Sequence, residues 1–174
     1  ATARGVVVIE AAGNGAEDLD HPAYERKLDR KKRDSGAIMV GAGAPALAGW
    51  TDRSRLDFSN YGSRVDVQGW GRMVATLDYG DLQGCDAARR KYTSTFGGTS
   101  SASPIVAGAA LLVESIVKTE NGCPMKPKEL RTLLAETGSP QTNGPHGSTK
   151  QNIGPRPDLA AAIERALQTS RCEP

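Results

Sequence analysis

The stretch from Phe96 to Val113 reads FGGTSSASPIVAGAALLV, a cluster of hydroxyl groups followed by an almost purely apolar run. Three serines, Ser100, Ser101 and Ser103, stand where a helix is predicted to begin. Unpaired N–H groups and the helix dipole favour negative charge at such a position. A serine there suits nucleophilic catalysis, in which an oxyanion develops. The alternative is that these hydroxyls only cap the helix.

A second group that could take part in this chemistry is the carboxamide of Asn14. It stands in the segment AAGNG, residues 11–15, after the β-branched run Val6–Ile9. The run predicts a strand buried on both faces, and the segment after it predicts a turn. An amide can donate a hydrogen bond to a developing oxyanion. The alternative is a plain turn residue, because Asn-Gly favours turns.

The order of these two segments is similar to that of a known family. Residues 98–104, GTSSASP, resemble the active-site motif Gly-Thr-Ser-x-Ala-x-Pro of subtilisin-like serine peptidases. The segment around Asn14 is similar to the stretch in that family that carries the oxyanion asparagine. Residues 35–42, 57–62 and 130–140 also look like family segments, so the resemblance covers roughly residues 5–167.

The resemblance implies a hydrolase of peptide bonds in which Ser100 is the nucleophile. It implies that the side-chain amide of Asn14 and the backbone N–H of Ser100 hold the oxyanion, with the hydroxyl of Thr99 in support. Three residues before the asparagine would line part of the pocket for the substrate residue that precedes the cut: Ala11, Ala12 and Gly13.

The catalytic acid and base of that family precede the serine, in the order Asp, His, Ser. Asn14 lies too near the first residue for either motif to precede it, and the two histidines, His21 and His146, lack the family's His-Gly-Thr context. We therefore expect residues 1–174 to be the C-terminal portion of a subtilisin-like catalytic domain. The N-terminal part would carry the Asp and the His, and this chain alone would be inactive, because serine without a base is a weak nucleophile.

The expected partners follow from this interpretation. They are a polypeptide substrate and the N-terminal half of the same catalytic domain. Without that half, the chain should expose a sheet edge and apolar surface, so self-association is expected. The alternative function is a non-catalytic binding or scaffolding module, against which the intact Ser100 and Asn14 argue. A third class, a nucleotide-binding oxidoreductase, rests only on the GxGxxA pattern of residues 41–46, which no convincing helix follows.

The predicted elements alternate between strands and helices. Strands are predicted at residues 6–9, 37–40 and 65–67, and helices at 101–119, 128–136 and 158–167. This order indicates an α/β fold, which the resemblance extends to three α/β/α layers with a mostly parallel sheet. Because residues 101–119 are apolar nearly all round, that helix is expected to be central and buried. Residues 76–95 predict an irregular loop.

Composition excludes some classes of function. The chain has 174 residues and a formal net charge of +2, so no strong field points to nucleic acid or to a membrane surface. The longest apolar run, Ile105–Val113, is shorter than the ~20 residues that span a bilayer. The charged run ERKLDRKKRD, residues 25–34, predicts a solvated loop. A nicking site for a trypsin-like protease and a contact with an acidic partner are the alternatives.

No cofactor or metal site is predicted. The three cysteines, Cys85, Cys123 and Cys172, form no CxxC pair, so zinc is not expected. Two of them could form a disulfide, or all three could be free thiols. The resemblance makes calcium possible, but no aspartates show the spacing of a calcium loop. It also implies an extracellular or periplasmic location, because the family is mostly exported.

Overall fold

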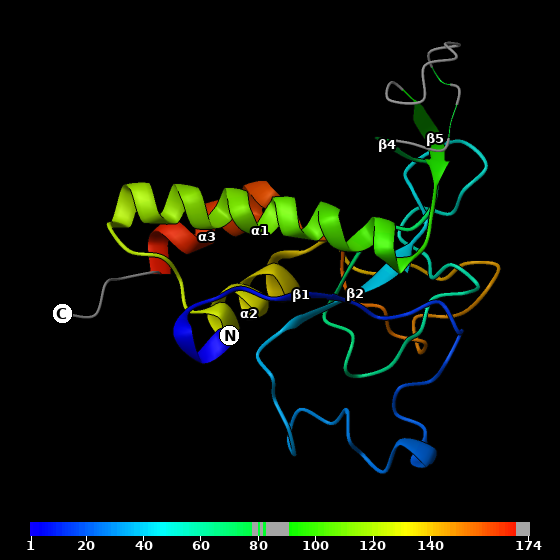
Figure 1. The fold of residues 1–174 in the computed structure, drawn as a ribbon, viewed down its shortest axis with the longest axis horizontal. Coiled ribbons are helices and arrows are strands. Elements are labelled where there is room, and N and C mark those ends of the chain that lie inside the picture. The colour runs from blue at the N-terminus through cyan, green and yellow to red at the C-terminus, as the bar shows by residue number, and fades with distance from the viewer. Residues whose placement is uncertain (78–79, 81, 83–90, 170–174) are drawn as a thin grey trace.

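The computed structural model describes residues 1–77, 80, 82 and 91–169 (Figure 1). Two 3₁₀ helices, η1 (Thr2–Arg4) and η2 (Pro22–Tyr24), lie in the first quarter of the chain. The strands are β1 (Ile9–Ala11), β2 (Ile38–Gly43), β3 (Val67–Trp70), β4 (Val74–Leu77) and β5 (Tyr92–Phe96). The helices are α1 (Thr99–Asn121), α2 (Pro127–Thr137) and α3 (Leu159–Thr169).

Strands β1, β2 and β3 form a parallel sheet in that order, with Ala11 paired to Val40 and Val40 to Val67. The α/β class with a parallel sheet is thereby confirmed. Each strand begins one to three residues later than predicted. The β-branched residues mark the start of each extended segment, and the small residues that follow continue the hydrogen-bonded ladder.

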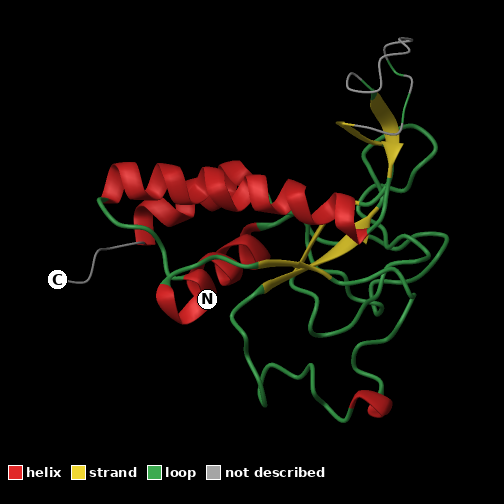
Figure 2. Cartoon of the chain, in the orientation of Figure 1, coloured by secondary structure: helices red, strands yellow, loops and turns green. Residues whose placement is uncertain are grey.

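All three α-helices share one core with the sheet. Ile38, Val40 and Val67 pack in a single cluster with buried residues of α1, α2 and α3. The opposite face of the sheet is covered by loops, whose cluster includes Ala12 and Ile153. Figure 2 shows that loops make up most of the chain between β1 and β3. Asn14 lies in the first of these loops.

Helix α1 differs from its prediction on one face. Its inner face is buried as expected, with residues such as Val106 and Val113 against the sheet. On its outer face, however, the exposed fraction is 42% for Ile105, 68% for Leu111 and 52% for Leu112. The expectation of a fully buried helix was therefore wrong for this chain. By length and composition α1 could also cross a membrane. Core helices that pack on a sheet, as α1 does, meet the same criterion.

Residues 76–95 are not wholly irregular. Strands β4 and β5 pair antiparallel and project away from the helices at one end of the molecule (Figure 1). The prediction missed β5 because its alternation of aromatic and hydroxylated residues, YTSTF, was not used as a strand signal. Cys123 is disulfide-bonded. Cys85 and Cys172, with which its pairing was left open, lie outside the described residues.

Candidate active site

The N-terminus of α1 is shaped by Gly98, which has φ 108° and ψ 168°. Residues that carry a side chain rarely adopt this backbone conformation, so glycine is required here. The N–H of Gly98 donates to the carbonyl of Gly71 (2.9 Å), and the hydroxyl of Ser101 donates to the carbonyl of Gly98 (2.8 Å). The turn that precedes Ser100 is thus fixed from both sides. Ser101 is buried.

Ser100 stands in the first turn of α1 and is exposed. Among the described residues, no group forms a hydrogen bond with its hydroxyl or with its backbone N–H. A Cβ atom built on Gly98 would lie 3.0 Å from Oγ of Ser100 and 3.3 Å from Nδ2 of Asn14. The structure therefore brings the two predicted residues, 86 positions apart, to the same glycine.

Thr99 orients the side chain of Asn14. The N–H of Thr99 donates to Oδ1 of Asn14 (2.8 Å), and its hydroxyl donates to the same oxygen (3.0 Å). The N–H of Gly13 in turn donates to the hydroxyl of Thr99 (3.1 Å). Because Oδ1 is occupied in this way, the Nδ2 group is left as the free end of the amide. Among the described residues, nothing accepts a hydrogen bond from it.

The three residues before Asn14 differ in exposure. Ala11 ends β1 and is exposed, and Gly13 is half-buried with φ +99°. The side chain of Ala12 is buried in the cluster on the loop side of the sheet. Ala12 therefore belongs to the core, and its N–H and carbonyl already bond to Val40 and Asn60.

Sequence reasoning missed Asn60, whose side chain holds the loop around Asn14. It accepts hydrogen bonds from the N–H groups of Gly15 (3.0 Å) and Glu17 (2.8 Å) and donates to the carbonyl of Ala12 (2.8 Å). The only sequence signal was its place in the stretch DFSNYG, residues 57–62, which was noted only as similar to a family segment.

Neither histidine contacts the serine. Nδ1 of His21 accepts a hydrogen bond from the N–H of Ala23 (3.3 Å) and caps η2. The carbonyl of His146 accepts a hydrogen bond from Nη2 of Arg55 (2.7 Å). Within the part of the chain that the structure describes, no general base forms a hydrogen bond with Ser100.

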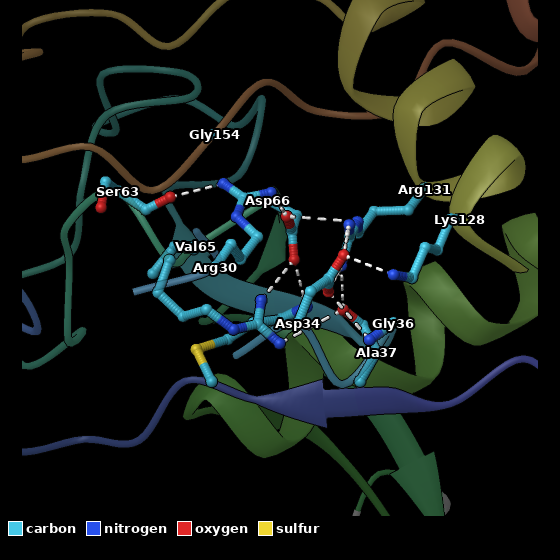
Figure 3. A network of polar contacts seen from close by, with 12 residues as sticks. Arg30, Asp34, Gly36, Ala37, Ser63, Val65, Asp66, Lys128, Arg131 and Gly154 are labelled. Atoms are coloured by element: carbon cyan, nitrogen blue, oxygen red, sulfur yellow. Dashed lines mark hydrogen bonds and ion pairs between the residues drawn. The ribbon is translucent and has the colours of Figure 1, made fainter. Parts of the chain in front are cut away.

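A charged cluster, which we call the arginine network, surrounds Asp34 and Asp66, which precede β2 and β3 in the chain (Figure 3). Asp66, with a side chain 1% exposed, accepts from Nη1 of Arg64 (2.7 Å) and the N–H of Met39 (2.8 Å), and it pairs with Arg30. The carboxylate of Asp34 accepts hydrogen bonds from both terminal nitrogens of Arg131, at 2.7 and 2.8 Å. These two hydrogen bonds hold the pKa of Asp34 far below its usual range.

The acidic residues of the arginine network are candidates for metal ligands because they lie close together. Across residues 1–77, 80, 82 and 91–169, no three His, Cys, Asp or Glu side chains lie close enough to hold a metal ion. Asp34 and Asp66 already have guanidinium partners, so this donor set does not fit calcium. The GxGxxA pattern does not fit a dinucleotide either, because β2 is followed by β3 with no described helix between them.

The similarity to known proteins extends over most of the chain. The model of the subtilase family, peptidase S8, matches residues 1–155. An extracellular protease of Xanthomonas campestris pv. campestris is 31% identical over 140 residues, which are 79% of this chain and 20% of that protein. Subtilisin BL of Lederbergia lenta is 35% identical over 117 residues, which are 66% of this chain and 34% of that protein. The chain thus spans a minor part of these relatives.

Solved structures show the same fold. The patellamide maturation protease PatA has a TM-score of 0.67 at 23% identity, covering 97% of this chain and 54% of that chain. A serine protease of Aeromonas sobria has a TM-score of 0.66 at 20% identity, covering 99% of this chain and 38% of that chain. At these identities the likeness concerns the fold alone.

Proposed function

Because the chain belongs to the subtilase family, we propose that it supplies the nucleophile and the oxyanion hole of a serine endopeptidase. One observation carries the proposal. Thr99 occupies the oxygen of the Asn14 amide, and the free Nδ2 end lies beside Gly98 together with Oγ of Ser100. An exposed hydroxyl and an oriented amide donor beside the same glycine are what acyl transfer requires.

In this mechanism, Oγ of Ser100 attacks the carbonyl carbon of the scissile peptide bond. The carbonyl oxygen becomes negative and accepts hydrogen bonds from the N–H of Ser100 and from Nδ2 of Asn14. The N-terminus of α1 adds its partial positive charge. Collapse of the intermediate expels the amine and leaves an acyl group on Ser100, which water then hydrolyses.

Thr99 is a positioning residue in this scheme. Its N–H and hydroxyl fix the rotamer of Asn14 before substrate arrives, so little reorganisation accompanies the reaction. Ala11 and Gly13 would line the substrate pocket on the acyl side, whereas Ala12 would support them from the core. The substrate would be a polypeptide held along these exposed backbone groups.

The proton on Ser100 needs a base. We assign this role to a histidine, with its aspartate, in an N-terminal portion of the same catalytic domain outside residues 1–174. The lack of any described base at Ser100 and the small share of the relatives that the chain spans support this assignment. Residues 1–174 alone would be inactive for the same reason.

The N-terminal portion would dock on surface that this chain leaves uncovered. Strand β1 is an edge of the described sheet, with Glu10 and Ala11 exposed. The outer face of α1 begins at Ser100 and continues through Ile105, Leu111 and Leu112. Burial of this face would bring the base to the nucleophile. In its absence the same face would drive self-association.

The test is covalent labelling of the longer protein with a fluorophosphonate, which reacts with activated serines. We expect labelling of the wild type and none of Ser100→Ala. Loss of one oxyanion donor lowers kcat by about 10²–10³ in subtilisin itself, and Asn14→Ala should act on that scale. Labelling that persists in Ser100→Ala would refute the assignment, and an unlabelled wild type would favour the non-catalytic binding module.

An extracellular or periplasmic location is part of the proposal. The relative from Xanthomonas campestris is named as an extracellular protease. Fractionation of the producing cells, with an antibody against this chain, would test the location directly.

A further inference from the structure

The segment that carries Asn14 is a loop with little regular structure, yet its amide must be held steadily against Ser100. Residues 12–17 lie between the end of β1 and the next turn. Their backbone groups need partners outside the sheet. The side chain of Asn60 supplies three of them.

We propose that Asn60 is a positioning residue for the oxyanion hole, acting through the loop that carries Asn14. Its Oδ1 accepts from the N–H groups of Gly15 and Glu17, on the far side of Asn14. Its Nδ2 donates to the carbonyl of Ala12, on the near side. The two ends of one carboxamide thus hold the loop before and after the catalytic asparagine.

The backbone around Asn60 strengthens this hold. The N–H of Asn60 donates to the carbonyl of Gly13 (3.0 Å). A Cβ atom on Gly13 would lie 2.6 Å from Nδ2 of Asn60, so the glycine permits the close approach. Any larger residue at position 13 would push the two segments apart.

Asn60 is itself anchored in the core. The neighbouring Ser59 is fully buried, and its hydroxyl donates to the carbonyl of Asn60 (3.0 Å) while accepting from the N–H of Ala42 in β2 (2.9 Å). Nη1 of Arg55 donates to the carbonyl of Ser59 (3.0 Å). A continuous set of hydrogen bonds therefore leads from the central strand through Asn60 and Thr99 to the side chain of Asn14.

The inference rests on the proposed function, and it predicts a specific kinetic effect. In the longer protein, Asn60→Ala should lower kcat by about 10–100-fold and change KM by less than about threefold, since misplacement of a donor by 1 Å can cost about 10² in rate. Asn60→Asp keeps both acceptor interactions but loses the donor to Ala12. It should recover part of the lost kcat.

Asn152 provides a matched control. Its half-buried side chain also makes three hydrogen bonds to backbone: to the carbonyls of Gly62 (2.9 Å) and Val65 (3.0 Å), and from the N–H of Gly154 (3.1 Å). Asn152→Ala removes as many bonds at a site that does not touch the Asn14 loop. We expect it to lower the melting temperature much as Asn60→Ala does, with kcat within about twofold of the wild type.

A double-mutant cycle gives the decisive readout. If Asn60 acts through Asn14, then Asn60→Ala adds less than about threefold to the loss of kcat already caused by Asn14→Ala. Full additivity of the two losses, or equal kinetic effects of Asn60→Ala and Asn152→Ala, would overturn the inference while leaving the proposed function intact. A wild type that neither turns over peptide nor reacts with the fluorophosphonate would instead overturn the proposed function.

Discussion

The first turn of α1 and the arginine network differ in whether their polar groups have hydrogen-bond partners. At the first turn, the hydroxyl and N–H of Ser100 and the Nδ2 of Asn14 have no partner among the described residues. In the arginine network, Asp34 and Asp66 are each held by several donors, and Asp66 is almost fully buried. The first region is neutral and open, and the second is charged and closed.

The difference predicts which property depends on each region: catalysis on the first turn of α1, and stability on the arginine network. A buried charge without partners is costly, so the network must be complete for the fold to be stable. An oxyanion donor must be free in the resting protein, because a donor already bonded cannot stabilise the transition state. Substitutions in the first region should therefore change chemistry, and substitutions in the second should change stability.

The largest expected effect is that of Ser100→Ala on turnover by the longer protein. Removal of the nucleophile costs about 2 × 10⁶ in kcat in subtilisin, and we expect a comparable loss. Because Ser100 is exposed and Gly98 is the N-cap, the free energy of unfolding should change by no more than about 0.5 kcal/mol. Peptide hydrolysis and urea unfolding of the same samples check both parts. A clear loss of stability in Ser100→Ala would contradict the expected difference between the two regions.

The next effect is the converse, in the arginine network. Asp66→Asn keeps an acceptor for the N–H of Met39 but leaves Arg64, whose side chain is 6% exposed, without its buried carboxylate. We expect a loss of about 3–5 kcal/mol in the free energy of unfolding. Glu136→Gln is the control, since its pair with Arg165 is half-exposed and worth at most about 1 kcal/mol. Equal losses in the two variants would contradict the prediction.

The pH dependence of stability sharpens the same contrast. The bonds from Arg131 lower the pKa of Asp34 below its unfolded value, so the unfolded chain takes up the proton first. The stabilisation is complete above the unfolded pKa of about 4 and is lost as pH falls below it, by at most about 1.4 kcal/mol per pH unit. Urea unfolding between pH 5 and pH 2 should show a shallower slope for Asp34→Asn. Identical slopes would count against the assignment.

The smallest effect concerns Glu114, a half-buried carboxylate with incomplete partners. Its Oε2 accepts from the N–H of Met125 (3.1 Å), whereas its Oε1 is buried without a partner among the described residues. Burial raises the pKa of Glu114, so the stabilisation of its neutral form is present at low pH and lost as pH rises through the raised pKa.

Glu114→Gln should therefore raise the melting temperature at pH 7 by no more than about 2–3 °C, and the difference should vanish near pH 4. Calorimetry at the two pH values measures it. A variant that is less stable than the wild type at pH 7 would show that the ionised carboxylate has a partner of its own.

Local sequence was sufficient to predict the chemical groups at the first turn of α1. The motif GTSSASP is continuous in the sequence, and AAGNG follows a recognisable strand. Ser100, Thr99 and Asn14 could therefore be named as candidate site residues from their resemblance to family motifs. The helices were also predicted to within two residues, because apolar residues at helical spacing mark their extent.

Long-range partners could not be predicted in the same way. Asn60 and Asn14 are 46 positions apart, and nothing in DFSNYG distinguishes an asparagine that binds a distant loop from one in a turn. The network of Asp34, Asp66 and Arg131 likewise joins three distant segments. The charged run at residues 25–34 was interpreted as solvated, yet Arg30 and Asp34 anchor it to the core.

The outer face of α1 has a practical consequence for anyone who produces this chain. The face starts at Ser100 and runs past Gly108, which has nothing within 4 Å of its missing side chain, to Leu111. Polar replacements at Leu111 or Leu112 would improve the yield of soluble protein from a heterologous host. Selection for expression would thereby remove the surface on which, in our proposal, the N-terminal portion docks, so the more soluble sample would no longer report on that docking.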